Sequence, residues 1–484
     1  MVFLSKSNYL IGLQCPKYLW VIFNNKEIIP EVSAEQQHIL EQGLMVENHA
    51  KKLFPEGIEI NKEPTEEQLK MCKPLFEAKF VFENIHARAD ILKPVNKNEW
   101  DIIEVKSGTK IKDVNLHDLS FQKYCYEKAG LKIRKACIMH INNRYIRKAK
   151  LDLNELFIIE DMTEDVNAYM EGIDKRIDKM FQIIKQKEMP ETGIHIKCND
   201  PYPCKLKNQC WKLPDGNVFE LYRNGRSSFE LFDQNIVEIK DVPNEYKITA
   251  KQRIQIQCAK EKVVHVNKEE VLNFLKQIKE PEYFLDFECF NPAIPVYENA
   301  KPYQQIPFQF SLHVRTDDNL IHYSYIADGS DDPREKFIEE LKKVLGTKGS
   351  ILVYNQRFEK HIINSLAEIF PKYKKWAQSL DKRFVDLWIP FKNFYYYNPK
   401  QKGSASIKYV LPALTNVSYE GLAINNGLLA SSEFLRMALG DKDGKLPSEE
   451  EIENIRKNLE EYCGLDTEAM IFIVDKLKNI AELT

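Results

Sequence analysis

The spacing of hydrophobic and polar positions divides the first 215 residues into a helical start, a strand-rich middle and a helical end. From residue 1 to residue 55 the apolar positions recur at helical spacing, most clearly over Glu35–Phe54. The elements predicted after residue 55 are, in order, strands at Lys79–Glu83, His86–Leu92 and Trp100–Lys106, a helix near Leu116–Ala129, a strand at Lys135–Ile141 and a helix near Thr163–Gln186. This order predicts an α/β domain.

A second block of strands and helices begins at Tyr283, after a stretch of weak periodicity. Residues 216–278 carry no recognisable chemistry, and we interpret them as a bridge between residues 1–215 and a second α/β domain over residues 279–484. The predicted elements of the second domain are strands at Tyr283–Phe290, Ile306–Thr316, His322–Ala327 and Ser350–Asn355 and helices at Pro333–Leu345, Glu359–Ile369 and Ser448–Ile480.

Composition and charge narrow the class of protein. At about 100–200 residues per domain, 484 residues predict two to four domains. No apolar run approaches the ~18–20 residues that span a bilayer, and the N-terminus lacks the pattern of a signal peptide, so we expect a cytoplasmic protein with no membrane partner. The net charge of −3 excludes a strongly basic coat for nucleic acid but leaves room for a local basic groove.

Two carboxylates and a lysine lie at the ends of adjoining predicted strands. Residues i and i+2 of a strand share a face, so Glu104 and Lys106 project together, and Asp90 sits near the end of the preceding strand. This set suits phosphodiester hydrolysis, in which acids hold Mg²⁺ and a lysine stabilises charge around the phosphate. Alone the pattern is common, because half-polar strands often carry such residues.

The neighbours of this set extend the pattern. Gly43 is followed four residues later by Glu47, and Gln122 is followed four residues later by Tyr126 on one helix face. In this order the motifs resemble those of the RecB-type PD-(D/E)XK nucleases. The resemblance implies a restriction-endonuclease-like core, in which Mg²⁺ or Mn²⁺ is bound by Glu47, Asp90 and Glu104. It also implies that Lys106 is catalytic and that Gln122 and Tyr126 support the site or contact DNA.

Four of the ten cysteines form a second pattern. Cys198, Cys204 and Cys210 are evenly spaced in a turn-rich stretch, and Cys15 precedes the predicted nuclease core. In a cytosolic chain such a group predicts a metal site before it predicts disulfides, and the wide spacing is less typical of zinc. The layout resembles the iron–sulfur members of the RecB-like class, as in CRISPR adaptation and AddB-type repair subunits. The resemblance implies a [4Fe–4S] cluster held by these four thiolates, with a structural role.

A third pattern lies in the second domain. The apolar strand Tyr283–Phe290 carries Asp286 and Glu288 at i and i+2, and paired acids on a core strand require a cation. Downstream, Glu359 begins a predicted helix after a strand. Near the C-terminus, Tyr462 and Asp466 lie one helical turn apart.

In this order the three segments resemble the DnaQ-like 3′→5′ exonucleases of the DEDDy type, which have an RNase H-like fold. The resemblance implies that Asp286, Glu288, Glu359 and Asp466 bind two Mg²⁺ or Mn²⁺ ions and that Tyr462 orients the attacking water. The sequence departs from the usual pattern at Glu359, where aspartate is the rule. Asp386 is an alternative ligand.

Between these motifs, aromatic residues are interleaved with lysines over residues 394–403. Such a segment suits stacking and charge contacts with single-stranded nucleic acid, and it equally suits aromatic packing under a loop. The candidate nucleic-acid contacts of this domain are Asn355, Tyr396, Lys402 and Lys408.

Together the motifs predict a metal-dependent nuclease that acts on single-stranded DNA or DNA ends. The second domain is expected to digest 3′→5′, and the first to provide a second site. The combination also resembles an uncharacterised bacterial family that joins these two domains. We expect a setting in DNA repair, processing or defence, with a helicase or other repair proteins as partners. Two alternatives stay open: a nucleic-acid-binding scaffold with vestigial sites, and an RNA exonuclease, since nothing in the sequence reads a 2′-hydroxyl.

Overall fold

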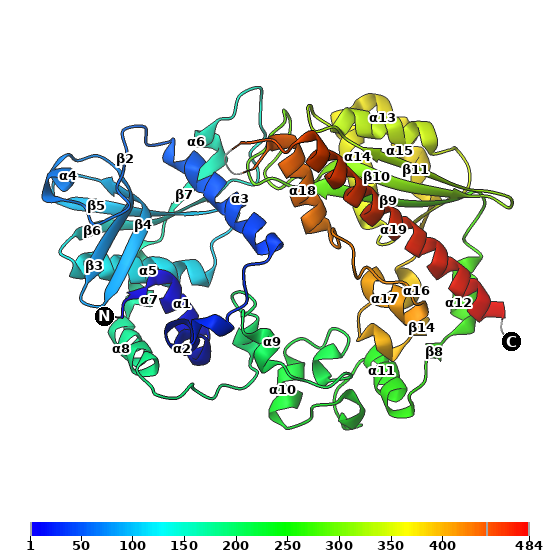
Figure 1. Cartoon of the computed structure of the whole chain (residues 1–484), viewed down its shortest axis with the longest axis horizontal. Coiled ribbons are helices and arrows are strands. Elements are labelled where there is room, and N and C mark those ends of the chain that lie inside the picture. The colour runs from blue at the N-terminus through cyan, green and yellow to red at the C-terminus, as the bar shows by residue number, and fades with distance from the viewer. Residues whose placement is uncertain (1, 442–443, 483–484) are drawn as a thin grey trace. The chain divides into compact units, whose positions relative to one another are not determined.

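The computed structural model describes residues 2–441 and 444–482, which fold into a mixed α/β protein (Figure 1). The chain forms two compact units. Unit 1 contains residues 1–212 and the short segment Pro292–Gln304, and unit 2 contains residues 213–291 and 305–484. Within the described residues, no helix combines the length and the apolar composition needed to cross a bilayer.

Unit 1 is built on a seven-stranded sheet in the order β2-β3-β4-β5-β6-β7, with β1 paired to β4. The β3–β4 and β4–β5 pairs are antiparallel hairpins, whereas β5 and β6 run parallel because helix α5 connects them. The strands are β1 (Leu4–Ser5), β2 (Ile58–Glu59), β3 (Leu75–Phe82), β4 (Ile85–Pro94), β5 (Glu99–Lys106), β6 (Lys132–Ile141) and β7 (Phe157–Asp161).

Helices cover the apolar faces of this sheet. One face packs Leu75, Ala87, Ala89 and Ile102 against α5 and the N-terminal helices, and the opposite face packs Ile91, Ile103 and Met139 against α3. The helices of unit 1 are α1 (Lys6–Gln14), α2 (Pro16–Asn24), α3 (Ala34–Lys51), α4 (Glu66–Lys70), α5 (Asp113–Lys128), α6 (Leu153–Leu156), α7 (Thr163–Met170), α8 (Ile173–Ile184) and α9 (Lys207–Cys210).

Several elements of unit 1 differ from the sequence prediction, which lacked β2, α4, α6 and β7. The single helix predicted over Thr163–Gln186 is divided into α7 and α8, because Gly172 adopts a left-handed conformation with φ +66° that ends the helical path. The helical start expected over residues 1–55 begins with strand β1, which pairs in parallel with β4.

The segment Pro292–Gln304 joins unit 1, although the flanking strands belong to unit 2. Ala293 and Ile294 are buried in the cluster that contains Ile103 and Met139. The hydroxyl of Tyr303 donates to the carbonyl of Ser107, directly after Lys106. The contiguous domain predicted over residues 279–484 is therefore interrupted at this segment.

Unit 2 is built on a five-stranded sheet in the order β11-β10-β9-β12-β13. Strands β11, β10 and β9 are antiparallel, whereas β12 runs parallel to both β9 and β13. The strands are β9 (Glu282–Phe290), β10 (Ile306–Arg315), β11 (Leu320–Ile326), β12 (Ser350–Val353) and β13 (Phe384–Asp386). A separate pair is formed by β8 (His265–Val266) and β14 (Tyr396–Tyr397).

Alternate residues of β9 are buried on opposite faces of this sheet. Leu285 and Phe287 pack against α13 and α14, and Phe284 packs in the cluster that contains Met470 and Ile473 of α19. The helices after β9 are α13 (Arg334–Val344), α14 (Arg357–Ile369), α15 (Lys374–Leu380), α16 (Ile389–Lys392), α17 (Ile407–Leu414), α18 (Gly427–Leu439) and α19 (Glu449–Glu482). The long helix α19 lies along one face of the sheet (Figure 1).

The predicted bridge is folded as part of unit 2. It contains α10 (Ser227–Asp233), α11 (Ala250–Glu261) and α12 (Lys268–Leu275), and it has an apolar cluster of its own that includes Val218, Leu231 and Ile256. Its weak periodicity reflects short helices separated by 3₁₀ turns, which leave few repeats of any one spacing.

Candidate functional site

The end of β5 brings three of the predicted residues of unit 1 together. Ile91 of β4 pairs with Ile103 of β5, so Asp90 and Glu104 stand opposite each other just beyond the last ladder pair. Asp90 Oδ2 accepts a hydrogen bond from the backbone N–H of Val105 at 2.7 Å, which fixes this carboxyl against β5. The structure therefore places Asp90, Glu104 and Lys106 side by side.

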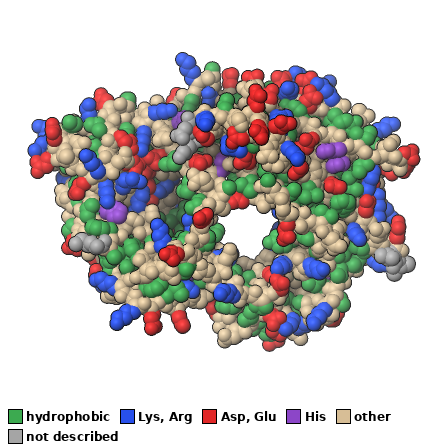
Figure 2. Space-filling model, in the orientation of Figure 1, with side chains coloured by type: hydrophobic (Ala, Val, Ile, Leu, Met, Phe, Trp, Pro, Cys, Tyr) green, Lys and Arg blue, Asp and Glu red, His purple; other side chains and the backbone are tan. Residues whose placement is uncertain are grey.

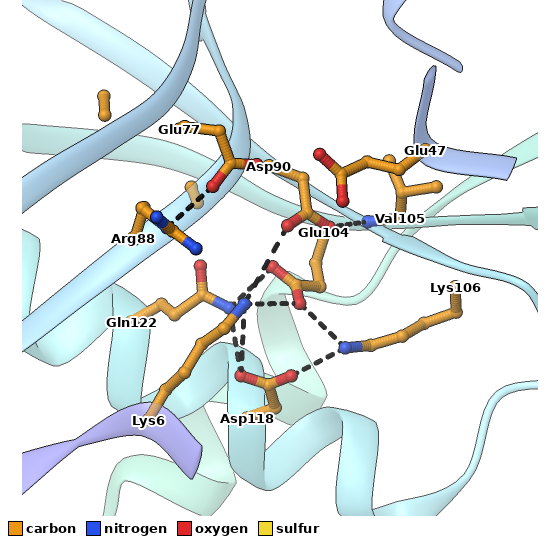
Figure 3. A network of polar contacts seen from close by, with 12 residues as sticks. Lys6, Glu47, Glu77, Arg88, Asp90, Glu104, Val105, Lys106, Asp118 and Gln122 are labelled. Atoms are coloured by element: carbon orange, nitrogen blue, oxygen red, sulfur yellow. Dashed lines mark hydrogen bonds and ion pairs between the residues drawn. The ribbon is translucent and has the colours of Figure 1, made fainter. Parts of the chain in front are cut away.

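A network of polar contacts surrounds Glu104, which is 2% exposed (Figure 3). Its Oε1 atom accepts from the ammonium groups of Lys106 and Lys6, each at 2.7 Å, and its Oε2 atom accepts from Gln122 Nε2 at 2.7 Å. Lys106 also donates to Asp118 Oδ2 at 2.7 Å, and Gln122 to Asp118 Oδ1 at 3.0 Å. Lys6 and Asp118 were not predicted from the sequence. Asp118 lies four residues before Gln122 on α5, a helical spacing that could have found it, whereas no local pattern points to Lys6.

A second group of acids adjoins this network. One carboxylate oxygen from each of Glu47, Glu77 and Asp90 lies within 4.8 Å of the others, a geometry that could hold a metal ion. Glu47 belongs to α3 and accepts from Lys51 at 2.7 Å. Glu77 was missed because the predicted strand began two residues later. It stands opposite Asp90 in the β3–β4 register with φ +55°, a strained backbone conformation of the kind that collects at functional sites.

The charges of the two groups shift the pKa values of their members. Burial and the nearby Glu104 raise the pKa of Asp90 to about 8. Burial and a hydrogen bond with Glu47 raise the pKa of Glu77 to about 7. Burial opposes the charged form of Lys106, but Asp118 and Glu104 outweigh it and raise the pKa of that lysine. Carboxyl groups that burial and neighbouring acids keep protonated near neutral pH are suited to exchange their protons for a divalent ion.

Gln122 and Tyr126 are both fully buried, so they support the site and do not face a ligand in this structure. The Tyr126 hydroxyl accepts from the backbone N–H of Ala89 at 2.7 Å and donates to the carbonyl of Ala78 at 2.6 Å. It therefore joins β3 and β4 beside Glu77 and Asp90, where the ladder between the strands is distorted. The alternative that these two residues contact DNA does not fit their burial.

The four predicted cysteines converge on one cavity of unit 1. Cys15 lies between α1 and α2, and the cavity is lined by Cys15, Cys198, Cys204 and Cys210 together with His195 and Trp211. All four are free thiols. Burial raises the pKa of Cys204 to about 11, and Cys15, Cys198 and Cys210 add to this effect because thiolates repel one another. Thiols gathered in this way need a metal to stabilise their charged form, so the donor set fits a thiolate-bound metal centre.

In unit 2, β9 and α19 bring three predicted acids together. Oxygens of Asp286, Glu288 and Asp466 lie within 4.8 Å of one another. Burial and Asp466 raise the pKa of Asp286 well above its ordinary value, and burial and Asp286 do the same for Glu288. Burial also raises the pKa of Asp466 to about 6. Among the described residues no ammonium lies in hydrogen-bond reach of these carboxylates, of which Glu288 and Asp466 are buried and Asp286 is half-buried, so they require protons or a divalent cation.

Other side chains complete this site. Glu359 stands at the start of α14 and is 2% exposed, and its Oε2 atom has no hydrogen-bond partner among the described residues. Burial and the charge of Asp286 raise the pKa of Glu359, although it lies outside the 4.8 Å group. Tyr419 donates to Asp466 Oδ1 at 2.5 Å, and its ring lies edge-on to that of Tyr462. No sequence signal points to Tyr419, because it comes from an irregular loop 47 residues before Asp466.

Asp386 has a structural role in this arrangement. Its Oδ1 atom accepts from the backbone N–H groups of Asn355 and Trp388, at 2.9 and 3.1 Å. These bonds hold the turn after β12 to the end of β13, and they involve one of the two oxygens of the carboxylate that was predicted as an alternative ligand.

The predicted nucleic-acid contacts of unit 2 are divided between surface and interior. Tyr396 is 5% exposed and pairs in β14, so its ring is part of the core and offers no open face for stacking. Asn355 is exposed, and Lys402 is exposed but paired with Asp215 at 2.6 Å. Lys408 is half-buried, donates to the carbonyl of Asn425, and lies 5.6 Å from the ring centroids of both Tyr419 and Tyr462. Lys408 is therefore the predicted contact that adjoins the acids.

Basic and acidic side chains are interspersed over the face of the protein drawn in Figure 2. This distribution agrees with a net charge of −3 and with the exclusion of a strongly basic coat.

A polar network ties β10 to α19 beside the acids of unit 2. Thr467 follows Asp466 and bonds His313 Nδ1 and Ser311 Oγ, each at 2.8 Å, and His313 stacks on His322. Burial and His322 lower the pKa of His313 from 6.5 to about 4. His313 therefore takes up a proton in the unfolded chain at a higher pH than in the folded chain, and its contribution to the free energy of unfolding should fall as the pH falls from 6.5 to about 4.

This pH dependence can be measured by urea unfolding. We expect the difference in stability between wild type and His313→Gln to shift against the wild type as the pH falls from 7 to 5, because glutamine does not titrate. Equal pH dependence in the two proteins would show that His313 is not responsible.

Comparisons with known proteins match part of the chain. Residues 283–406 match a domain of unknown function, DUF2779. That range includes Asp286, Glu288 and Glu359 but neither Tyr462 nor Asp466. An uncharacterized protein of Mycoplasma genitalium, MG366, is 26% identical over 224 residues, which are 42% of this chain and 32% of that protein. The chain thus covers about a third of that relative's length.

Proposed function

We propose that this chain is a metal-dependent nuclease with one hydrolytic site in each unit. The observation that carries the proposal is the convergence of Asp286, Glu288 and Asp466 from β9 and α19 within 4.8 Å, with the unpartnered oxygen of Glu359 buried nearby. Buried acids in excess over cations are the ligands that Mg²⁺ and Mn²⁺ prefer. The mixed sheet of unit 2 and the hairpin-helix-strand core of unit 1 are compatible with the RNase H-like and PD-(D/E)XK folds proposed for them.

In unit 2 the chain supplies ligands and positions the reactants. Asp286, Glu288, Asp466 and Glu359 would hold the divalent ions, which when bound lower the pKa of a water and stabilise the leaving oxygen of an in-line displacement. Tyr462, one helical turn from Asp466, would orient the attacking water. Tyr419 holds Asp466 in place through its 2.5 Å hydrogen bond. The ammonium of Lys408 adjoins both tyrosines and would contact a phosphate of the strand.

In unit 1 the same chemistry would be served by a different set of residues. Glu47, Glu77, Asp90 and Glu104 would provide the oxygen ligands. Lys106, held between Glu104 and Asp118, keeps its proton and would stabilise negative charge on the phosphate. Gln122 and Tyr126 fix the carboxylate and the strands behind the site.

The cysteine cavity would hold an iron–sulfur cluster that joins the α1–α2 junction to residues 198–210. We expect protein purified without oxygen to contain about four irons per chain, as a [4Fe–4S] cluster requires. Cys204→Ser should lose the iron and lower the thermal stability of unit 1. Cys72→Ser, the same exchange at a half-buried thiol outside the cavity, should retain both. Zinc in place of iron would contradict the cluster.

Single-stranded DNA or DNA ends are the proposed substrates, and repair, processing or defence in the cytoplasm is the proposed setting. The free thiols of all ten cysteines agree with a reducing compartment. The test follows 5′-labelled single-stranded DNA, and RNA of the same sequence, with anaerobically purified protein in Mg²⁺ or Mn²⁺ and in excess chelator. We expect a ladder of shortened DNA that needs the metal. Faster loss of the RNA would favour the RNA exonuclease, and binding without cleavage of either strand would favour the scaffold.

A further inference from the structure

The carboxylate of Glu104 is largely occupied before any metal binds. Its Oε1 atom accepts from two ammonium groups and its Oε2 atom from an amide, each at 2.7 Å. Each carboxylate oxygen has about two lone-pair positions, so the two lysines occupy those of Oε1. A divalent ion that binds Glu104 through Oε1 must therefore displace one of the two lysines.

The two lysines are held unequally. Lys106 has a second strong partner in Asp118 Oδ2 at 2.7 Å. The other acids near Lys6 are Asp90 at 3.9 Å and Asp118 at 4.0 Å, both beyond hydrogen-bond distance. Within the described residues, the hydrogen bond of the Lys6 ammonium is to Glu104 alone. Lys6 is thus the cation that can leave Glu104 with the smaller loss of contacts.

The backbone of Lys6 is fixed while its side chain is adjustable. Strand β1 pairs Ser5 with His86 of β4, and the Ser5 hydroxyl caps α1, so Lys6 is anchored as the first residue of that helix. A lysine side chain has four rotatable methylenes and a compact ammonium that hydrates well. Figure 3 shows Lys6 reaching Glu104 from α1, apart from the strand that carries Lys106.

We propose that Lys6 is a tethered counter-cation of the unit 1 site, which neutralises Glu104 and Asp90 in the metal-free protein and is exchanged for a divalent cation. This inference rests on the proposed function, because it concerns the same carboxylates. It assigns to Lys6 a competition with metal that Lys106, bound by two acids, does not share. The negative charges of Glu104 and Asp90 would then be compensated in both states, by Lys6 in the metal-free protein and by the divalent cation in the metal-bound protein.

The test is a calorimetric titration of Mn²⁺ into the full chain carrying Asp286→Asn and Glu288→Gln, which weaken the site of unit 2. Into this background we place Lys6→Met, which removes the charge and keeps the length of the side chain. Lys93→Met is the matched control, since Lys93 lies exposed on the strand of Asp90, at an odd separation that turns it to the other face. Glu104→Gln removes a proposed ligand of unit 1, so the heat of Mn²⁺ binding that is lost in this variant is assigned to the unit 1 site.

We expect Lys6→Met to bind Mn²⁺ at least about tenfold more tightly, because a neighbouring opposite charge changes the proton affinity of a carboxylate by about ten- to a thousandfold. Without metal its melting temperature should fall, and Mn²⁺ should raise that temperature more than in the background. Lys6→Gln repeats the measurement if the methionine variant does not fold.

The outcomes separate the two claims. Equal or weaker Mn²⁺ affinity in Lys6→Met overturns the role of Lys6 while the metal site stands. If Glu104→Gln does not reduce the heat of Mn²⁺ binding measured for the background protein, the metal site of unit 1 itself is overturned. If Lys93→Met gains as much Mn²⁺ affinity as Lys6→Met, the gain comes from the change in net charge alone, and the proposal is also overturned.

Discussion

Asp286→Asn should abolish the 3′→5′ degradation of single-stranded DNA and at the same time leave the protein as stable as the wild type or more stable. Asparagine has the shape of aspartate, so β9 keeps its packing, but a ligand charge is lost. We expect the rate to fall by at least about 10³-fold, since removal of one group that stabilises transition-state charge already costs about 10²–10³. Stability should not fall, because Asp286, Glu288 and Asp466 repel one another within 4.8 Å.

The measurement combines a single-turnover digestion of 5′-labelled DNA with a thermal melt in the absence of metal. Asp317→Asn removes an exposed acid from the turn between β10 and β11 and should change neither result. A ladder that persists in Asp286→Asn would remove the acids of unit 2 from the reaction. A large drop in the melting temperature would show that the variant acts through folding.

Glu104→Gln should have the opposite effect on stability. The second cleavage pattern, which we assign to unit 1, should disappear, and the 3′→5′ ladder should remain. Because Glu104 is the shared partner of Lys6 and Lys106, its neutralisation leaves two partly buried ammonium groups without their common counter-charge. Removing one partner of a buried ion pair costs about 3–5 kcal/mol, so we expect the free energy of unfolding of unit 1 to fall by roughly 3 kcal/mol.

Thermal melts and cleavage of labelled DNA test this variant together. Glu99→Gln is the matched control, because Glu99 begins the same strand and pairs with Lys132 near the surface. Unchanged cleavage in Glu104→Gln would exclude unit 1 as a nuclease. A melting temperature equal to that of the wild type would show that the lysines find other partners and that the network around Glu104 is not the source of its stability.

The contrast between the two variants follows from how each site balances its charge. In the part of unit 2 that the structure describes, no ammonium lies in hydrogen-bond reach of the gathered acids, so loss of one acid relieves repulsion. In unit 1 Glu104 accepts hydrogen bonds from both Lys6 and Lys106, so neutralising this acid removes the shared counter-charge of two cations. Two sites of similar proposed chemistry are thus expected to respond in opposite directions to the same kind of substitution.

Local periodicity determined much of both candidate sites from the sequence. A strand repeats every two residues, so Glu104 with Lys106 and Asp286 with Glu288 had to share faces. A helix repeats every 3.6 residues, so Tyr462 and Asp466 had to lie one turn apart on α19. The strands β4, β5, β9 and β10 and the helices α5, α14 and α19 agree with the prediction to within a few residues, because each has a long and regular apolar pattern.

Only the tertiary structure decided which distant residues join these local sets. Lys6 contacts Glu104, which lies 98 residues away in the sequence, and Tyr419 contacts Asp466, which lies 47 residues away. No local sequence pattern predicts either contact. Tyr396 has the composition of a stacking surface, yet packing places it in the core. Segment Pro292–Gln304 joins unit 1 although its neighbours in sequence belong to unit 2. The reason is physical: a sequence fixes the period and chemistry of each element, whereas contacts between elements depend on how their apolar faces are buried together.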